Sequence, residues 1–147
     1  DSLPNDKVVG LLSSNNTNIF SASNNGKGFI SNINQLMTNQ RKGRQYFNLK
    51  NNDLVLKVFS ISKSHVACVT NLQKLLIFDK NYVPNLQKGV GVQLIKIKNK
   101  DHLSDIIEIN PKDGLEWTTG SKNRNLDSVD FWLGKRARIN FLALFLF

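Results

Sequence analysis

Short apolar runs separated by polar turns recur along the whole chain. The runs are four to eight residues long, rich in Val, Ile, Phe and Thr, and bounded by Asn-rich or Gly-containing turns. This pattern predicts β-strands. The expected strands are 8–12, 18–23, 29–33, 45–49, 54–61, 65–70, 75–78, 92–98, 105–109 and 115–118. Only two short segments, 33–38 and 128–133, are helical candidates, so we expect an all-β fold.

The runs also repeat. Segment 18–24 (Asn-Ile-Phe-Ser-Ala-Ser-Asn) aligns with segment 65–71 (His-Val-Ala-Cys-Val-Thr-Asn) at an offset of 47 residues, and the same offset places Lys27 over Lys74. A weaker third copy has its strand at 114–119. A period of 40–50 residues with about four strands per copy is typical of bladed β architectures, in which each small sheet buries its faces against its neighbours.

The period divides the chain into about three four-stranded blades of about 47 residues, which would form an incomplete disc or an open arc. The expected blades are 8–53, 54–101 and 102–140. The whole chain, 1–147, is expected to be one domain of a larger protein, because it begins with Asp rather than Met. The apolar tail 141–147 is too short to span a bilayer. It either covers an open blade edge or forms an aggregation-prone terminus.

The chain is strongly basic, with 20 Lys and Arg against 11 Asp and Glu and a formal net charge of +9. Such a charge favours a polyanionic partner. Lys27 and Lys74 share one repeat position, and Lys42 and Lys88 share another, so the charges should form a curved stripe that follows a phosphate backbone. The expected DNA-binding residues are Lys27, Arg41, Lys42, Arg44, Lys74, Lys88, Lys122, Arg124, Lys135, Arg136 and Arg138.

Candidate catalytic and metal-binding residues are sparse. His65, His102 and Cys68 do not have the spacing of metal ligands, so no metal site is predicted. Cys68 lies in an apolar run, where a thiol is a core residue rather than a nucleophile, and a single cysteine suits a reducing cytoplasm. Segment 89–91 (Gly-Val-Gly) lacks the Lys-Ser/Thr of a phosphate-binding loop. We therefore predict no catalytic residue and no cofactor in this chain.

Four short motifs, in this order and spacing, support a family assignment. They are 86–94 (Leu-Gln-Lys-Gly-Val-Gly-Val-Gln-Leu), 103–105 (Leu-Ser-Asp), 113–117 (Asp-Gly-Leu-Glu-Trp) and 132–137 (Trp-Leu-Gly-Lys-Arg-Ala). Together they resemble the C-terminal domain of bacterial type IIA topoisomerase A subunits, in particular those of DNA topoisomerase IV. The resemblance covers about residues 7–139.

The resemblance implies a β-pinwheel, a propeller-like disc whose blades exchange a strand with their neighbours. It also implies a non-catalytic domain that binds and bends double-stranded DNA without sequence specificity, and presents it for decatenation and relaxation. The implied partners are the ATP-binding B subunit and the rest of a dimeric A subunit, with no membrane. The DNA-breaking tyrosine, the ATP site and Mg²⁺ would belong to other parts of an ATP-dependent enzyme in the bacterial cytoplasm, associated with the nucleoid.

One departure from the family separates its two branches. Gyrase A subunits carry a Gln-Arg-Arg-Gly-Gly-Lys-Gly box, of which segment 40–44 (Gln-Arg-Lys-Gly-Arg) is only a partial copy. The resemblance therefore implies bending rather than full wrapping of DNA, and topoisomerase IV rather than gyrase. Two alternatives stay open, namely a protein-interaction propeller whose basic face binds an acidic protein, and the equivalent domain of gyrase.

Overall fold

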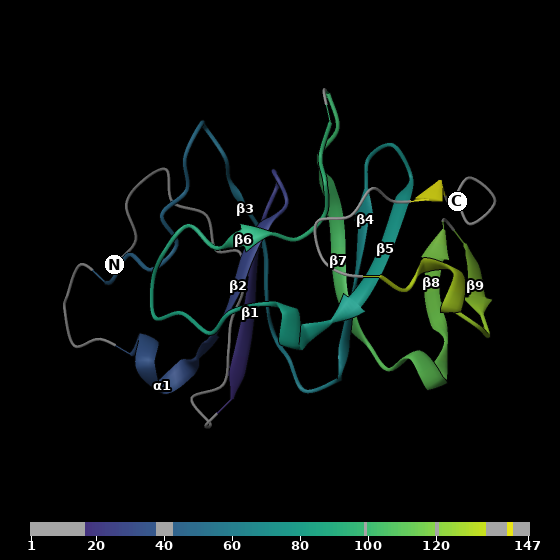
Figure 1. Ribbon diagram of the computed structural model, residues 1–147, viewed down its shortest axis with the longest axis horizontal. Helices are drawn as coiled ribbons and strands as arrows, with labels where there is room; N and C mark the ends of the chain where they lie inside the picture. Colours follow the sequence, from purple (N-terminus) through teal and green to yellow (C-terminus); the bar gives the residue numbers. More distant parts are fainter. Residues whose placement is uncertain (1–16, 38–42, 99, 120, 135–140, 143–147) are drawn as a thin grey trace.

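The computed structural model consists of small antiparallel sheets placed side by side (Figure 1). It describes residues 17–37, 43–98, 100–119, 121–134 and 141–142. The strands are β1 (Asn18–Ser23), β2 (Lys27–Asn32), β3 (Val55–Ser60), β4 (His65–Thr70), β5 (Lys74–Asp79), β6 (Val92–Gln93), β7 (Leu103–Ile109), β8 (Leu115–Thr119), β9 (Lys122–Leu126) and β10 (Phe141–Leu142). One helical turn, α1 (Ile33–Leu36), and three 3-10 turns, η1 (Lys80–Tyr82), η2 (Pro111–Asp113) and η3 (Asp130–Trp132), connect them.

The strands form three sheets. The first has the order β3-β1-β2-β6, the second has the order β10-β5-β4-β7, and the third is the β8-β9 hairpin. The all-β prediction is confirmed, and β1 and β4 have the expected bounds. The polar strand β9 was not predicted, because its sequence Lys-Asn-Arg-Asn-Leu has almost no apolar signal. The predicted strand 8–12 lies outside the described residues. No helix within the described ranges is long and apolar enough to cross a membrane.

Two predicted strands are largely wrong. Segment 45–49 forms only an isolated bridge between Phe47 and Gly89, and segment 92–98 is a strand only at β6. A strand needs a partner along its whole length, and β6 leaves the edge of β2 after two residue pairs. Leu94 and Ile95 then turn into the core, where both are fully buried. Burial of these side chains therefore ends the strand that the apolar run predicted.

The 47-residue repeat is preserved in individual hydrogen bonds. The N–H of Lys27 donates to Ser23 Oγ at 3.1 Å after the β1–β2 turn, and the N–H of Lys74 donates to Thr70 Oγ1 at 3.2 Å after the β4–β5 turn. Both first strands shift register at the same place, at Ser23 and Thr70. Because the offset preserves turns, bulges and side-chain braces together, each copy is one structural unit.

The predicted blade limits do not match the sheets. β3 lies within the range 54–101, but it pairs with β1 of the first sheet, and β7 lies within 102–140, but it pairs with β4 of the second. The third strand of each sheet follows a tight turn and returns antiparallel beside the first strand. The described residues therefore contain two four-stranded sheets and a two-stranded third, rather than three four-stranded blades.

A strand from later in the chain completes each four-stranded sheet. β6 follows β5 in sequence but pairs with β2, and β10 pairs with β5 in the same way. Close backbone contact allows this exchange, since a Cβ at Gly91 would lie 2.6 Å from the carbonyl oxygen of Gly28. Exchanged strands are what the pinwheel resemblance implied. β10 also places residues 141–142 of the apolar tail on an edge of β5, while residues 143–147 lie outside the described part of the chain.

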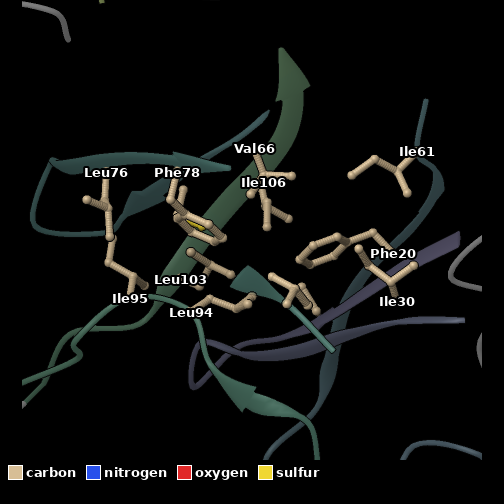
Figure 2. Packing of buried hydrophobic residues seen from close by; sticks show 13 residues of the cluster. Phe20, Ile30, Ile61, Val66, Leu76, Phe78, Leu94, Ile95, Leu103 and Ile106 are labelled. Atoms are coloured by element: carbon tan, nitrogen blue, oxygen red, sulfur yellow. The ribbon is translucent and has the colours of Figure 1, made fainter. Parts of the chain in front are cut away.

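Two apolar clusters join the three sheets. The first lies between the first and second sheets, and Figure 2 shows Phe20 and Ile30 facing Val66, Phe78 and Ile106 across it. The second cluster joins the other face of the second sheet to the third, through residues that include Ala67, Ile77, Leu115 and Trp132. Neighbouring residues of β4 thus point into different clusters, as the two-residue period of a strand requires.

Cys68 lies in the first cluster and is fully buried. Burial raises the pKa of the Cys68 thiol above its ordinary value of 9.0, and the negative charge of Asp105 raises this pKa further. We predict that an aromatic disulfide reagent modifies this thiol at least about a hundredfold more slowly in the native protein than in denaturant, because the thiolate is the reactive form. Equal rates in the two states would contradict this placement.

The raised pKa of Cys68 has a consequence for stability. Above pH 9.0 the unfolded chain gains a thiolate that the folded chain does not form. The stabilisation is therefore fully present below pH 9.0 and is lost as the pH rises towards the folded-state pKa. Denaturant titrations between pH 7 and 10.5 should show a steeper loss for the natural chain than for a Cys68→Ala variant.

Candidate nucleic-acid interface

The predicted DNA-binding residues fall into three groups. The side chains of Lys27, Arg44, Lys74 and Lys88 are described. For Lys122 and Arg124 the structure gives the place in β9. Arg41, Lys42, Lys135, Arg136 and Arg138 lie outside the described residues, so their assignment stays a prediction.

Lys27, Lys74 and Lys122 occupy the same position in three hairpins. Each is the first residue of the second strand, directly after the hairpin turn. The side chains of Lys27 and Lys74 are half-buried. We use the term hairpin-turn end for the end of the first two sheets where the turns 24–26, 50–53, 71–73 and 98–101 lie, along the upper edge of Figure 1.

Lys88 lies in a loop on the outer edge of β2. Leu86 donates its N–H to the carbonyl of Ile30 at 2.8 Å, which holds the chain against this edge before the loop. Gly89 then donates its N–H to the carbonyl of Tyr46 at 2.8 Å and accepts from the N–H of Asn48 at 2.7 Å. The Lys-Gly turn is therefore fixed to the protein through its glycine, while the Lys88 side chain is exposed.

Arg44 lies elsewhere on the molecule. Its Nη1 donates to the carbonyl of Gln35 in α1 at 2.6 Å, and α1 follows the end of β2 opposite the hairpin turn. Two residues later, the hydroxyl of Tyr46 lies 2.9 Å from Ser21 Oγ, and Phe47 packs edge-on against Phe29 with ring centroids 5.0 Å apart. These contacts bring the segment after the first basic turn beside the second basic turn. They also show that Arg44 does not share one line with Lys27 and Lys74.

Sequence reasoning missed three exposed lysines at the hairpin-turn end. Lys50 and Lys98 begin the equivalent turns before β3 and β7, and Lys100 lies in the second of these turns. The alignment of 50–53 with 98–101 at an offset of 48 residues was the signal that could have identified them. Among the described residues, no group of three His, Cys, Asp or Glu side chains could hold a metal ion. The candidate interface is therefore an exposed basic surface.

Comparison with known proteins decides the family. Residues 17–62 and 74–110 match the family model described as "DNA gyrase C-terminal domain, beta-propeller", which is more than half of the chain. The chain belongs to this family. Membership in the DNA gyrase C-terminal domain family agrees with the resemblance stated from the sequence motifs, and the order of the matched segments follows the two four-stranded sheets.

Relatives within and near this family carry one recurring name. The chain is 36% identical over 115 residues to the A subunit of DNA topoisomerase 4 from Rickettsia bellii, an alignment that covers 78% of this chain and 16% of that protein. It is 25% identical over 138 residues to the A subunit of DNA topoisomerase 4 from Escherichia coli, covering 87% of this chain and 18% of that protein. The chain thus spans less than a fifth of these relatives, and their names do not favour the gyrase alternative.

Solved structures confirm the pinwheel-type fold. The Escherichia coli ParC C-terminal domain superposes with a TM-score of 0.77 at 24% identity, covering 90% of this chain and 58% of that one. A DNA gyrase A C-terminal domain gives a TM-score of 0.68 at 16% identity, covering 88% of this chain and 44% of that one. The arrangement of exchanged-strand sheets is therefore shared by both branches of the family.

Proposed function

We propose that this chain is a non-catalytic domain of a topoisomerase IV A subunit that binds and bends double-stranded DNA. The observation that carries the proposal is the recurrence of lysines at one structural position, Lys27, Lys74 and Lys122, on a blade array of the DNA gyrase C-terminal family. Repetition in space suits a partner whose charges also repeat, and the phosphate backbone of a duplex is such a partner.

The proposed mechanism is electrostatic. Lysine ammonium groups contact phosphates, which positions the duplex without reading its sequence, and binding releases condensed counterions. A curved array would also bend the DNA. Bending 20–30 base pairs by 40–90° costs about 1–6 kcal/mol, so several phosphate contacts must offset that cost. The formal net charge of +9 supports this proposal.

In this proposal the chemistry of strand passage belongs to the rest of the protein. Its partners would be the B subunit, together with the remainder of a dimeric A subunit, in the bacterial cytoplasm, with ATP and Mg²⁺ bound outside this chain. The relatives are five to seven times longer than the aligned segment, which leaves room for those parts. The Tyr46 hydroxyl lies 2.9 Å from the buried Ser21, an arrangement that suits a packing role rather than a DNA-breaking nucleophile.

A salt series on random-sequence duplex DNA tests the proposal. With about five phosphate contacts, log K should fall linearly with log salt with a slope of about −4.5, a loss of several hundred-fold between 50 and 200 mM salt. Fluorescence energy transfer between the ends of a 30-base-pair duplex should rise on binding. A flat salt dependence, or no DNA binding near physiological salt while an acidic protein is retained, would contradict the proposal and favour the protein-interaction alternative.

A further inference from the structure

The two ends of the sheets differ in charge. Among the described residues, the hairpin-turn end carries Lys27, Lys50, Lys74, Lys98 and Lys100 against Asp53 and Asp101. The opposite end carries Arg44, Lys63, Lys80 and Lys112 against Asp79, Glu108, Asp113, Glu116 and Asp127. Lysines therefore dominate one end, while carboxylates outnumber the basic groups at the other.

The two aspartates of the hairpin-turn end are engaged with backbone groups. Asp53 Oδ1 accepts from the N–H of Asn25 at 3.0 Å, and in the second sheet Asp101 Oδ1 accepts from the N–H of Leu72 at 3.1 Å. Asp101 is also buried, at 8% relative exposure. These carboxylates therefore brace the turns, and the ammonium groups of Lys50, Lys98 and Lys100 form no ion pair with any residue that the structure describes.

The same bonds hold the lysines in equivalent places. Asp53 donates its N–H to the carbonyl of Lys50, and Asp101 donates its N–H to the carbonyl of Lys98, both at 3.0 Å. Lys100 has φ +63°, a left-handed conformation that closes the second turn. Each of the two sheets thus presents an exposed lysine at the start of the same tight turn.

Hydrogen bonds also join the turns of the two sheets into one continuous surface. Leu103 donates its N–H to the carbonyl of Asn24 at 2.7 Å, which links the second sheet to the first hairpin turn. Asn71 donates its N–H to the carbonyl of His102 at 2.8 Å, which links the second hairpin turn to the turn before β7. In Figure 1 these turns follow one another along a single edge of the molecule.

We infer that the hairpin-turn end is a contact surface for the phosphate backbone of duplex DNA, with Lys50, Lys98 and Lys100 extending the row begun by Lys27 and Lys74. This inference rests on the proposed function, and it selects the side on which the duplex lies. The surplus of carboxylates at the opposite end would repel a polyanion. DNA therefore crosses both sheets at one end instead of contacting both ends equally.

A pair of charge-matched variants of the 147-residue chain tests this inference. The first combines Lys50→Gln, Lys98→Gln and Lys100→Gln. The control combines Lys63→Gln, Lys80→Gln and Lys112→Gln, which removes the same charge at the opposite end. The first variant should lose at least about tenfold in DNA affinity at 100 mM salt, with a salt slope shallower by up to about 2.7, while the control should change less than about threefold.

Each other outcome has a defined meaning. Equal losses in both variants would show that net charge alone acts, and no loss in the first variant would show that this surface does not contact DNA. Both results overturn the inference while the natural chain still binds DNA. Weaker binding of polyglutamate with unchanged DNA affinity would assign the surface to an acidic protein and also overturn it. Failure of the natural chain to bind DNA would instead reject the proposed function.

Folding of the variants is checked by denaturant unfolding. If the triple variant does not fold, Lys50→Gln with Lys98→Gln is compared with Lys63→Gln with Lys112→Gln. These four side chains are exposed, so their replacement removes little packing. The expected slope difference is then about 1.8, because two phosphate contacts are lost.

Discussion

Replacing Phe20 with Ala is expected to lower the free energy of unfolding by about 3–5 kcal/mol. Phe20 is fully buried in the cluster between the first two sheets and stacks on Phe59 with ring centroids 5.4 Å apart. Truncation removes apolar burial and leaves a cavity bounded by two sheets that cannot close on it without moving apart. Denaturant unfolding followed by tryptophan fluorescence and by far-ultraviolet circular dichroism measures the loss.

Phe131→Ala is the matched control, because the Phe131 side chain is 61% exposed and packs only at the protein surface, against Trp132 at 5.2 Å. Its cost should stay below about 1 kcal/mol, the range of an exposed aromatic contact. If Phe20→Ala cost no more than this control, the two sheets would not share a cooperative core. The two sheets would then unfold as separate units, and the surface that spans both would not be rigid.

Gly91→Ala is the second substitution with a large expected effect, a loss of about 2–4 kcal/mol. Gly91 has φ +82°, and a Cβ there would lie 2.6 Å from the carbonyl oxygen of Gly28. Any side chain must therefore push β6 away from β2. Denaturant unfolding measures the cost, and amide hydrogen exchange at Gly28 and Val92 should show that the exchanged strand opens first.

Gly43→Ala provides the control for backbone strain alone. Gly43 has φ +78°, similar to Gly91, but nothing lies within 4 Å of the position that its Cβ would take. Its cost should be about 1 kcal/mol, the ordinary cost of a left-handed alanine. Equal costs for the two variants would mean that contact between Gly91 and Gly28 does not limit the strand exchange.

The exchanged strand connects stability to the proposed function. The loop that carries Lys88 lies between the contact of Leu86 with Ile30 and the start of β6, so it is fixed at both ends to the edge of β2. A detached β6 would free this loop. Loss of DNA affinity in Gly91→Ala at a temperature where the chain remains folded would therefore assign part of the binding to the ordered loop.

Much of the fold followed from local patterns. β1 and β4 were predicted with their bounds, and the 47-residue offset that aligns them also holds for Lys27 and Lys74 in the structure. The candidate site was less predictable. Arg44 was expected beside these lysines but lies next to α1, because a single turn sequence does not specify towards which end of a sheet its side chains project.

The partial gyrase-like box leaves the choice between bending and wrapping to the family resemblance. Most of segment 40–44 lies outside the described residues, so bending rather than wrapping stays a prediction. The lysines of the hairpin-turn end provide a separate basis for DNA contact, because their placement depends on turns that are braced in both sheets.

The sequence by itself determined which residues form strands, where the turns lie and how long one repeat is, because these properties depend on side chains that are neighbours along the chain. Only the tertiary structure decided that β3 returns to β1, that β6 crosses to β2, and that Lys50 and Lys98 share one surface. Those choices depend on which faces pack together and on where a backbone without a Cβ can approach another. Such contacts join residues that lie tens of positions apart, so no local pattern specifies them.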